Sequence, residues 1–295
     1  MGIFDELLRQ KPTKTLFENN KNKLKGEKLA KEIYRRLQEK TSEDIISFQL
    51  CEQQCSLTDN KIGGDYFVLP DADIPINSNG QPLILLAQLN FEEMPKIKEL
   101  PNRGILQIFI DGHDGIYGMD FDAYQSNIRY IEEVPDYQTI KQCTIVSSCG
   151  TIGNEKQQEE LILPMDSSKQ FMLIPKLVKQ CLSIEDYRFE KFLISECADI
   201  LPVDEKGRYD LFLDEQAYDW LCDNNVWLDC QIGGYPHFTQ SDIRKENTSQ
   251  QYLLFQLNSC NAIMWGDAGI ANFFISSIDL NKKNFNNVLY NWDCG

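Results

Sequence analysis

The sequence lacks any apolar run long enough to cross a bilayer. Its 295 residues contain apolar runs such as 83–87 and 104–110, which are far shorter than the roughly 20 residues that a membrane-spanning helix needs. The first residues contain no apolar signal core, and Glu6 stands where a myristoylation motif needs Ser or Thr. We therefore expect a cytoplasmic protein without membrane insertion.

Histidine is scarce as well, because the chain has only His113 and His237. The ten cysteines form no CxxC pair, so no zinc-finger arrangement can be written, and buried free thiols are the simplest interpretation. The GxxxxGK[ST] and GxGxxG loops that bind phosphates are absent, and so is the GxSxG motif of a nucleophilic serine. The sequence therefore predicts no cofactor and argues against nucleotide-dependent chemistry.

What the sequence has in excess is negative charge. The first forty residues carry eleven Lys and Arg against six acids, a balance of +5, so with −16 for the whole chain the remainder carries −21. An acidic body repels nucleic acid and anionic membranes, so we expect neither as a partner. Two interpretations stay open, a surface that binds a basic protein and a solvated surface that keeps the protein soluble.

The hydrophobic content of 42% is typical of a globular protein. Residues 1–23 mix charge, Asn and Pro, and predict a loose arm. Apolar residues at helical spacing predict one amphipathic helix over 24–41, and a short strand follows at 47–51.

The middle of the chain, 150–227, predicts an irregular stretch followed by two helices with Ser183 and Asp214 as N-caps. We expect this segment to lie over the β core. Because no convincing linker interrupts the chain, residues 24–295 are expected to form one domain.

Three sequence blocks recur in the same order. The pairs are KIGGDYFVLP (61–70) with QIGGYPHF (231–238), LILLAQLN (83–90) with YLLFQLN (252–258), and GILQIFI (104–110) with GIANFFI (269–275). The offsets of the three pairs, 170, 168 and 165, nearly agree. This pattern predicts an internal duplication, with one repeat over about 58–135 and the other over about 228–294.

The short strands between Gly, Pro, Asn and Asp favour antiparallel pairing. The predicted fold class is α+β, mainly β: an antiparallel β-roll-like core from two pseudo-equivalent repeats, with peripheral helices and an N-terminal helix. Tight turns are expected at the glycines because glycine tolerates positive φ; they are Gly63, Gly64, Gly233, Gly234, Gly266 and Gly269.

These blocks resemble the YwqG-like family of uncharacterised bacterial proteins. The signatures are KIGGDYFVLP, QPLILLAQLNFEEMP and LPNRGILQIFID in the first half, and IGGYPHFTQSDIR, LLFQLNS, IMWGDAGIANFFI and VLYNWDC in the second. The resemblance runs from about residue 58 to the C-terminus and is weaker between 150 and 225. It implies a mainly-β, roll-like fold with peripheral helices and brings no activity, substrate or catalytic residue. Some members lie near secreted-toxin genes, which would suit an immunity-type or partner-binding role.

Two positions depart from the family pattern. Members often carry Lys or Arg before the second IGGYP, where this chain has Gln231. They also tend to have acids after the second Gln, whereas this chain offers Asn258, Cys260 and Asn261. If those acids bind a metal in relatives, this chain does not inherit the site.

The turn WGDAG, 265–269, has two interpretations. In the first, Asp267 is a cleft acid beside the indole of Trp265, acting as an acid or base or holding a cationic ligand. In the second, the Asp267 side chain bonds nearby backbone N–H groups and Trp265 anchors the core. The first repeat has ELPNRG at the matching place, so the turn belongs to the fold but the Trp–Asp pair does not.

The segment 111–122 concentrates acids around one histidine, and Asp111, His113 and Asp114 are the metal candidates. The EF-hand pattern fails because His113 occupies its third position and Gly115 comes one residue early. A hairpin loop of three to five residues between 106–110 and 116–120 explains the glycines and acids of this segment without a metal.

Other polar residues mark a predicted cleft between the repeats. Gln88 and Gln256 occupy equivalent places, where they would bond backbone across the repeat interface or line a polar cleft. His237 is expected to be a surface or turn residue, because no catalytic partner is evident. The candidates for the cleft are Trp265, Asp267, Gln88, Gln256, Tyr235, His237, Trp292 and Asp293.

Three functions remain open from the sequence. The first is a non-catalytic, acidic protein-binding module, immunity-type or stress-related, with a basic partner. The second is a hydrolase or lyase in which Asp267 acts as acid or base and Trp265, Tyr235 and Trp292 hold the substrate. The third is small-ligand binding without turnover.

Overall fold

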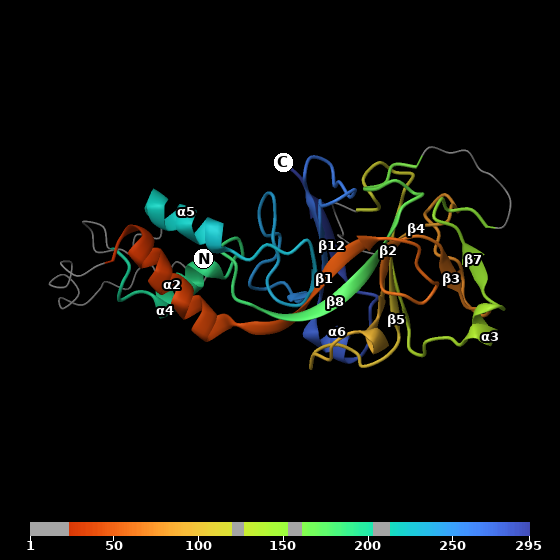
Figure 1. Cartoon of the computed structure of the whole chain (residues 1–295), viewed down its shortest axis with the longest axis horizontal. Helices are drawn as coiled ribbons and strands as arrows, with labels where there is room; N and C mark the ends of the chain where they lie inside the picture. Colours follow the sequence, from red (N-terminus) through yellow and green to blue (C-terminus); the bar gives the residue numbers. More distant parts are fainter. Residues whose placement is uncertain (1–23, 120–126, 153–160, 203–212) are drawn as a thin grey trace. The chain divides into compact units, whose positions relative to one another are not determined.

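The computed structural model describes residues 24–119, 127–152, 161–202 and 213–295 (Figure 1). The chain divides into two compact units, which we call the helical unit (up to Glu43, and Lys179–Trp227) and the β unit (Asp44–Val178 and Leu228–Gly295). The arm predicted for 1–23 lies outside the described residues. No helix in the described part of the chain is long and apolar enough to span a membrane.

The helical unit contains α2 (Gly26–Thr41), α4 (Phe189–Glu196) and α5 (Glu215–Asn224). Of the apolar residues whose spacing predicted α2, Ala30, Ile33 and Leu37 are buried and Tyr34 is partly buried. Asp214 caps α5 by accepting the N–H of Ala217 at 3.0 Å. The prediction for α4 was less accurate, because this helix begins six residues after the expected cap.

The β unit is built on one ten-stranded sheet. Its strands are β1 (Glu43–Glu52), β2 (Lys61–Gly63), β4 (Ile84–Asn90), β5 (Ile105–Ile110), β6 (Asn127–Ile131), β8 (Gln170–Gln180), β9 (Cys230–Ile232), β10 (Tyr252–Asn258), β11 (Ile270–Ile275) and β12 (Leu289–Asp293). A second, two-stranded sheet pairs β3 (Tyr66–Val68) with β7 (Thr144–Val146). The short helical elements are η2 (Phe91–Glu93), α3 (Tyr137–Ile140) and α6 (Ser277–Asn281).

The strand order of the large sheet is β12-β11-β10-β9-β1-β8-β2-β4-β5-β6. Figure 1 shows the two long strands β1 and β8 side by side. Four strands continue outward on each side of this central pair, in chain order, and we call these groups the first half (β2, β4, β5, β6) and the second half (β9, β10, β11, β12). The sheet is antiparallel and curled, so that apolar residues of both halves, such as Leu106 and Phe273, share one hydrophobic core. The fold is therefore mainly β with added helices.

Two details of the sheet differ from the sequence predictions. The strand β8 begins in a stretch that was expected to be irregular and contains Pro175, a residue that is uncommon inside a sheet. The pairing of β2 with β8 ends at Met172, so Pro175 lies beyond it. The predicted short hairpin is also wrong, because β5 pairs with β6 at 127–131 and residues 116–119 form no strand.

A line of polar side chains crosses each half of the sheet. The cross-strand pairs give a first polar row of Lys61, Gln88, Gln107 and Arg129, and a second polar row of Gln231, Gln256, Asn272 and Asn291. Apart from Arg129, every member is buried. Because buried polar groups must be hydrogen-bonded, these rows determine what can cover this face of the sheet.

The rows bind the main chain of the covering loops. The Gln88 Nε2 donates to the carbonyls of Leu57 and Asp59 at 2.9 Å each, and its Oε1 accepts from Gln107 at 3.1 Å. In the second half, Gln256 accepts the N–H of His237 at 2.8 Å. Of the two alternatives that the sequence left open, bonds across the repeat interface are not observed, because each glutamine bonds within its own half.

We predict that Gln88→Leu, which keeps the side-chain volume, lowers the free energy of unfolding by about 3 kcal/mol, because two buried carbonyls and the Gln107 amide lose their partner. Chemical denaturation measures this loss. Gln138→Leu, at an exposed amide without a side-chain hydrogen bond in the described part of the chain, is the control and should change stability little. Equal stability of the two variants would contradict a structural role for the row.

Candidate functional site

Trp265 is a core residue in a cluster of three rings. It is fully buried, its ring centroid lies 5.2 Å from that of Tyr117, and Trp292 lies 6.3 Å away. The Trp292 Nε1 donates to the carbonyl of Ile116 at 2.9 Å. The structure therefore brings the two predicted tryptophans together, packed against a loop of the first half. Sequence reasoning missed Tyr117, which adopts a φ of +58°.

Asp267 lies at the exposed tip of its turn. No donor in the described part of the chain binds its carboxylate, whereas its carbonyl accepts the N–H of Gly295 at 3.0 Å. Gly266 has a φ of +53°, and a Cβ at Gly269 would lie 2.0 Å from the carbonyl oxygen of Asp293. Both glycines are thus required by the backbone of the turn.

Asp293 and Tyr235 hold loops. The Asp293 carboxylate accepts the N–H and hydroxyl of Thr239 at 3.2 and 2.9 Å, and the N–H of Gln240 at 3.2 Å. Tyr235 is buried, and its carbonyl accepts from Gln231 at 3.2 Å. These contacts fix the segment that covers the second half.

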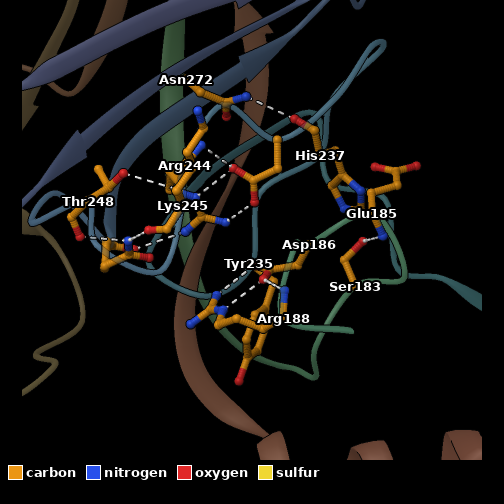
Figure 2. A network of polar contacts seen from close by, with 12 residues as sticks. Ser183, Glu185, Asp186, Arg188, Tyr235, His237, Arg244, Lys245, Thr248 and Asn272 are labelled. Atoms are coloured by element: carbon orange, nitrogen blue, oxygen red, sulfur yellow. Dashed lines mark hydrogen bonds and ion pairs between the residues drawn. The ribbon is translucent and has the colours of Figure 1, made fainter. Parts of the chain in front are cut away.

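His237 is fully buried, whereas a surface or turn position was predicted. Figure 2 shows the Asn272 amide directed at the His237 carbonyl, which it reaches at 2.9 Å. Since Gln256 binds the N–H of the same residue, the second polar row holds the His237 backbone on both sides. Sequence reasoning missed this burial because the anchors lie on two other strands.

Among the described residues of the β unit, Arg244 is the largest buried cation, and it is neutralised within its own loop. Figure 2 shows its guanidinium, which donates to Asp242 at 3.0 and 2.7 Å and to the carbonyl of Gln251 at 3.0 Å. It also lies 4.7 Å from the ring of Phe274. In the helical unit, Arg188 pairs with Asp186 at 2.6 Å (Figure 2). Both pairs satisfy the rule that buried charges are paired.

The metal candidates serve as loop acceptors. Asp111 accepts the N–H of His113 at 2.8 Å, and Asp114 accepts that of Ile116 at 2.9 Å. Among the described residues, no group of three or more His, Cys, Asp or Glu is arranged to hold a metal. The last acids of the segment 111–122, Asp120 and Asp122, lie outside the described residues.

Lys61, in the β unit, is an exception to the rule that buried charges are paired. It is 1% exposed and its Nζ donates to the carbonyls of Ser56 at 2.9 Å and Asp65 at 2.6 Å. It forms no ion pair with an acid in the described part of the chain. Burial lowers its pKa from 10.5 to about 8, and this effect outweighs the opposing influence of nearby Cys55 and Asp65.

Lys61 also lines a cavity of about 370 Å³, which we call the Lys61 cavity. Its lining includes Cys55, Ser148, Ser167 and Gln170. Gly64 is needed beside it, because a Cβ at its φ of +76° would lie 2.6 Å from the Gln170 Oε1. The IGG block was analysed for its glycines alone, so the lysine in front of them was missed.

The helical unit presents a second candidate, which we call the acidic face: Glu215, Tyr218, Asp219 and Asp223 of α5. The three acids recur every fourth residue, and Tyr218 is 54% exposed among them. On the opposite side of the helix, Ala217 and Leu221 are buried. None of the three acids forms an ion pair in the described part of the chain.

The fold and these sites define an α+β, mainly β protein with a curled antiparallel sheet, a buried lysine cavity and an acidic helix face. The chain belongs to the family described as a domain of unknown function (DUF1963), whose model matches residues 60–294. This match agrees with the resemblance to the YwqG-like family. No curated protein matches the chain.

We predict that Asp267→Asn leaves the free energy of unfolding unchanged, because the exposed carboxylate has no partner to lose. Thermal unfolding measures this. A large loss of stability would mean that the carboxylate takes part in the turn, as the structural interpretation required.

We predict that Lys61 makes stability rise with pH. Its pKa is about 8 in the folded chain against 10.5 for an ordinary lysine, so between these values the unfolded chain binds more protons and folding is favoured as pH increases. The full effect is about 3 kcal/mol.

The measurement is the difference in unfolding free energy between the parent and Lys61→Gln, followed from pH 7 to 10.5. Lys176→Gln, at an exposed lysine of β8, is the matched control and should show no such trend. A pH-independent difference for Lys61→Gln would overturn the assignment.

Proposed function

We propose that the protein is a non-catalytic binding module that recognises a basic protein through the acidic face of α5. The main support is that this face is acidic and aromatic, and that no cation of α5 offsets its negative charge. Like charges four residues apart destabilise a helix by about 0.2–0.5 kcal/mol per pair, so the helical unit gains nothing from this arrangement.

The other long helix of the unit supports this interpretation by contrast. In α2, Lys31 pairs with Glu27 at 2.6 Å and Arg36 pairs with Asp199 at 2.5 Å. Among its described residues, the same unit thus neutralises charge on one helix surface and leaves the charge of another without an ion pair. An exposed aromatic ring among acids is the composition of an interaction hot spot for a cationic surface.

The tests are the variants Tyr218→Ala and Asp219→Asn/Asp223→Asn, compared with the parent in affinity capture from the source cells at low and physiological salt. We expect one basic protein in stoichiometric amount from the parent, weakened by salt and lost from both variants. Asp71→Asn/Glu92→Gln removes two exposed charges from the β unit and is the matched control. Capture that is equal for all variants, or a captured protein that is acidic, would refute the proposal.

The catalytic alternative, a hydrolase or lyase around Trp265 and Asp267, has less support. Trp265 is fully buried, and Asp267 is exposed. A general acid works best in a partly apolar site that excludes water, and an exposed turn tip is not such a site.

We also propose that the protein works in the reducing environment of the cytoplasm. We propose that its binding role there is of the immunity type. All ten cysteines are free thiols, which is the usual state in the cytosol.

We further infer that the two halves of the sheet are copies of one ancestral unit. The support is the mirrored strand order, the irregularities at Leu85/Ala87 and Leu253/Phe255, and the shared use of the polar rows. Gln107 donates to the carbonyl of Phe67 just as Asn272 donates to that of His237, and the offsets of 165 and 170 are those of the sequence blocks.

A further inference from the structure

The two polar rows place different residues at one equivalent position. Lys61 opens the first row and Gln231 opens the second. Lys61 donates to the carbonyl of Asp65, and Gln231 donates to the carbonyl of Tyr235, four residues further along in each case. A neutral amide is therefore sufficient for this bond, whereas the second acceptors differ: Lys61 donates to the carbonyl of Ser56 and Gln231 to that of Gly233. The positive charge of Lys61 is left without a structural explanation.

Nothing in the described part of the chain neutralises that charge. The nearby carboxylates are engaged elsewhere, since Asp65 accepts the N–H of Ser148 at 3.0 Å and Asp59 accepts the N–H and hydroxyl of Ser56 at 2.6 Å each. An ammonium group has three donors, and the two carbonyls use two of them. The third N–H has no acceptor among the described residues.

The Lys61 cavity supplies further donors without partners. The hydroxyls of Ser148 and Ser167 and the Nε2 of Gln170 form no hydrogen bond in the described part of the chain. Gln170 is held in place by its Oε1, which accepts the N–H of Cys55 at 3.2 Å. A cavity with a buried ammonium and several spare donors matches an acceptor-rich anion.

We propose that the Lys61 cavity binds a small organic acid, whose carboxylate accepts the third N–H of Lys61 and hydrogen bonds from the spare donors beside it. The volume of about 370 Å³ lies at the lower end of ligand sites, so the occupant is a small metabolite. The site lies in the β unit and is independent of the acidic face.

The charges around the cavity favour one negative charge over two. Lys61 is the buried cation, whereas Lys169 at the lining is 35% exposed and pairs with Glu52 at 3.1 Å. Asp65 also lines the cavity and adds a negative charge. A phosphate dianion would meet this carboxylate with a single unshared cation to offset it, so a monocarboxylate fits better.

Binding is coupled to protonation. The groups that act on Lys61 are Cys55, Asp59 and Asp65, and its pKa of about 8 means that part of the population is neutral just above physiological pH. A bound carboxylate favours the ammonium form and raises the pKa of Lys61. The affinity therefore decreases by about tenfold for each pH unit above that pKa.

The experiment uses the full chain with acetate and propionate as probes, and chloride and inorganic phosphate at matched ionic strength as comparison anions. Binding is measured by thermal shift and by calorimetry in the parent, Lys61→Gln and the surface control Lys176→Gln. We expect carboxylate binding in the parent and the control, weakened by about tenfold to a hundredfold in Lys61→Gln. Lys61→Gln should fold, because Gln231 is the natural precedent for an amide there.

A measurement on the unaltered protein keeps the test valid whatever the variant does. Isotope-labelled lysine side chains, followed by NMR, should show an upward shift in the titration of one buried lysine when propionate is added. Absence of that shift, equal binding by Lys61→Gln, or a preference for phosphate or chloride would each overturn the proposal.

Discussion

The β unit depends on one constraint, which is that the polar groups buried on the covered face of the sheet must be paired. Each polar row meets most of this constraint by turning side chains of adjacent strands onto the main chain of the loop above, as Gln88 does with Leu57 and Asp59. In the described part of the chain, the Oε1 of Gln107 and the Oδ1 of Asn272 are buried without a hydrogen-bond partner. Leaving one such group unpaired costs about 1–3 kcal/mol, more than most single packing contacts contribute. The rows therefore fix the path of the covering loops, and the shared apolar core on the other face can be filled without regard to them.

The separation between polar rows on one face of the sheet and an apolar core on the other explains which features can be predicted from the sequence. The stripe of α2 and the strands β4, β5, β10 and β11 were predictable, because burial imposes a period on neighbouring residues. The strand β8 was not, because Pro175 weakens the local signal and the partners that make it a strand lie more than a hundred residues away. The family membership was predicted from the glycine-headed blocks, which are local features as well.

The candidate site was predictable in part, for the same reason. Trp265 and Trp292 were expected near each other, and they are, but the ring between them is Tyr117 from the other half. Burial of His237 and of Lys61 follows from the register of strands that no local pattern encodes. A single sequence does not distinguish a buried lysine from a surface lysine, since either can stand just before a turn. Only the pairing with Gln88 places it inside.

The proposed duplication supplies an internal comparison that separates fold from function. Where the halves agree, as in Gln88 with Gln256, the residue answers the hydrogen-bonding need of the sheet. Where they differ in charge, as in Lys61 with Gln231, either residue supplies the bond to the carbonyl four residues further along. That bond alone does not explain why the buried residue of the first half is charged. Burying an ammonium without a counter-ion lowers stability. Because Lys61 has no counter-ion among the described residues, we infer that a bound anion compensates this cost. The ligand is thus inferred from an asymmetry that folding alone does not require.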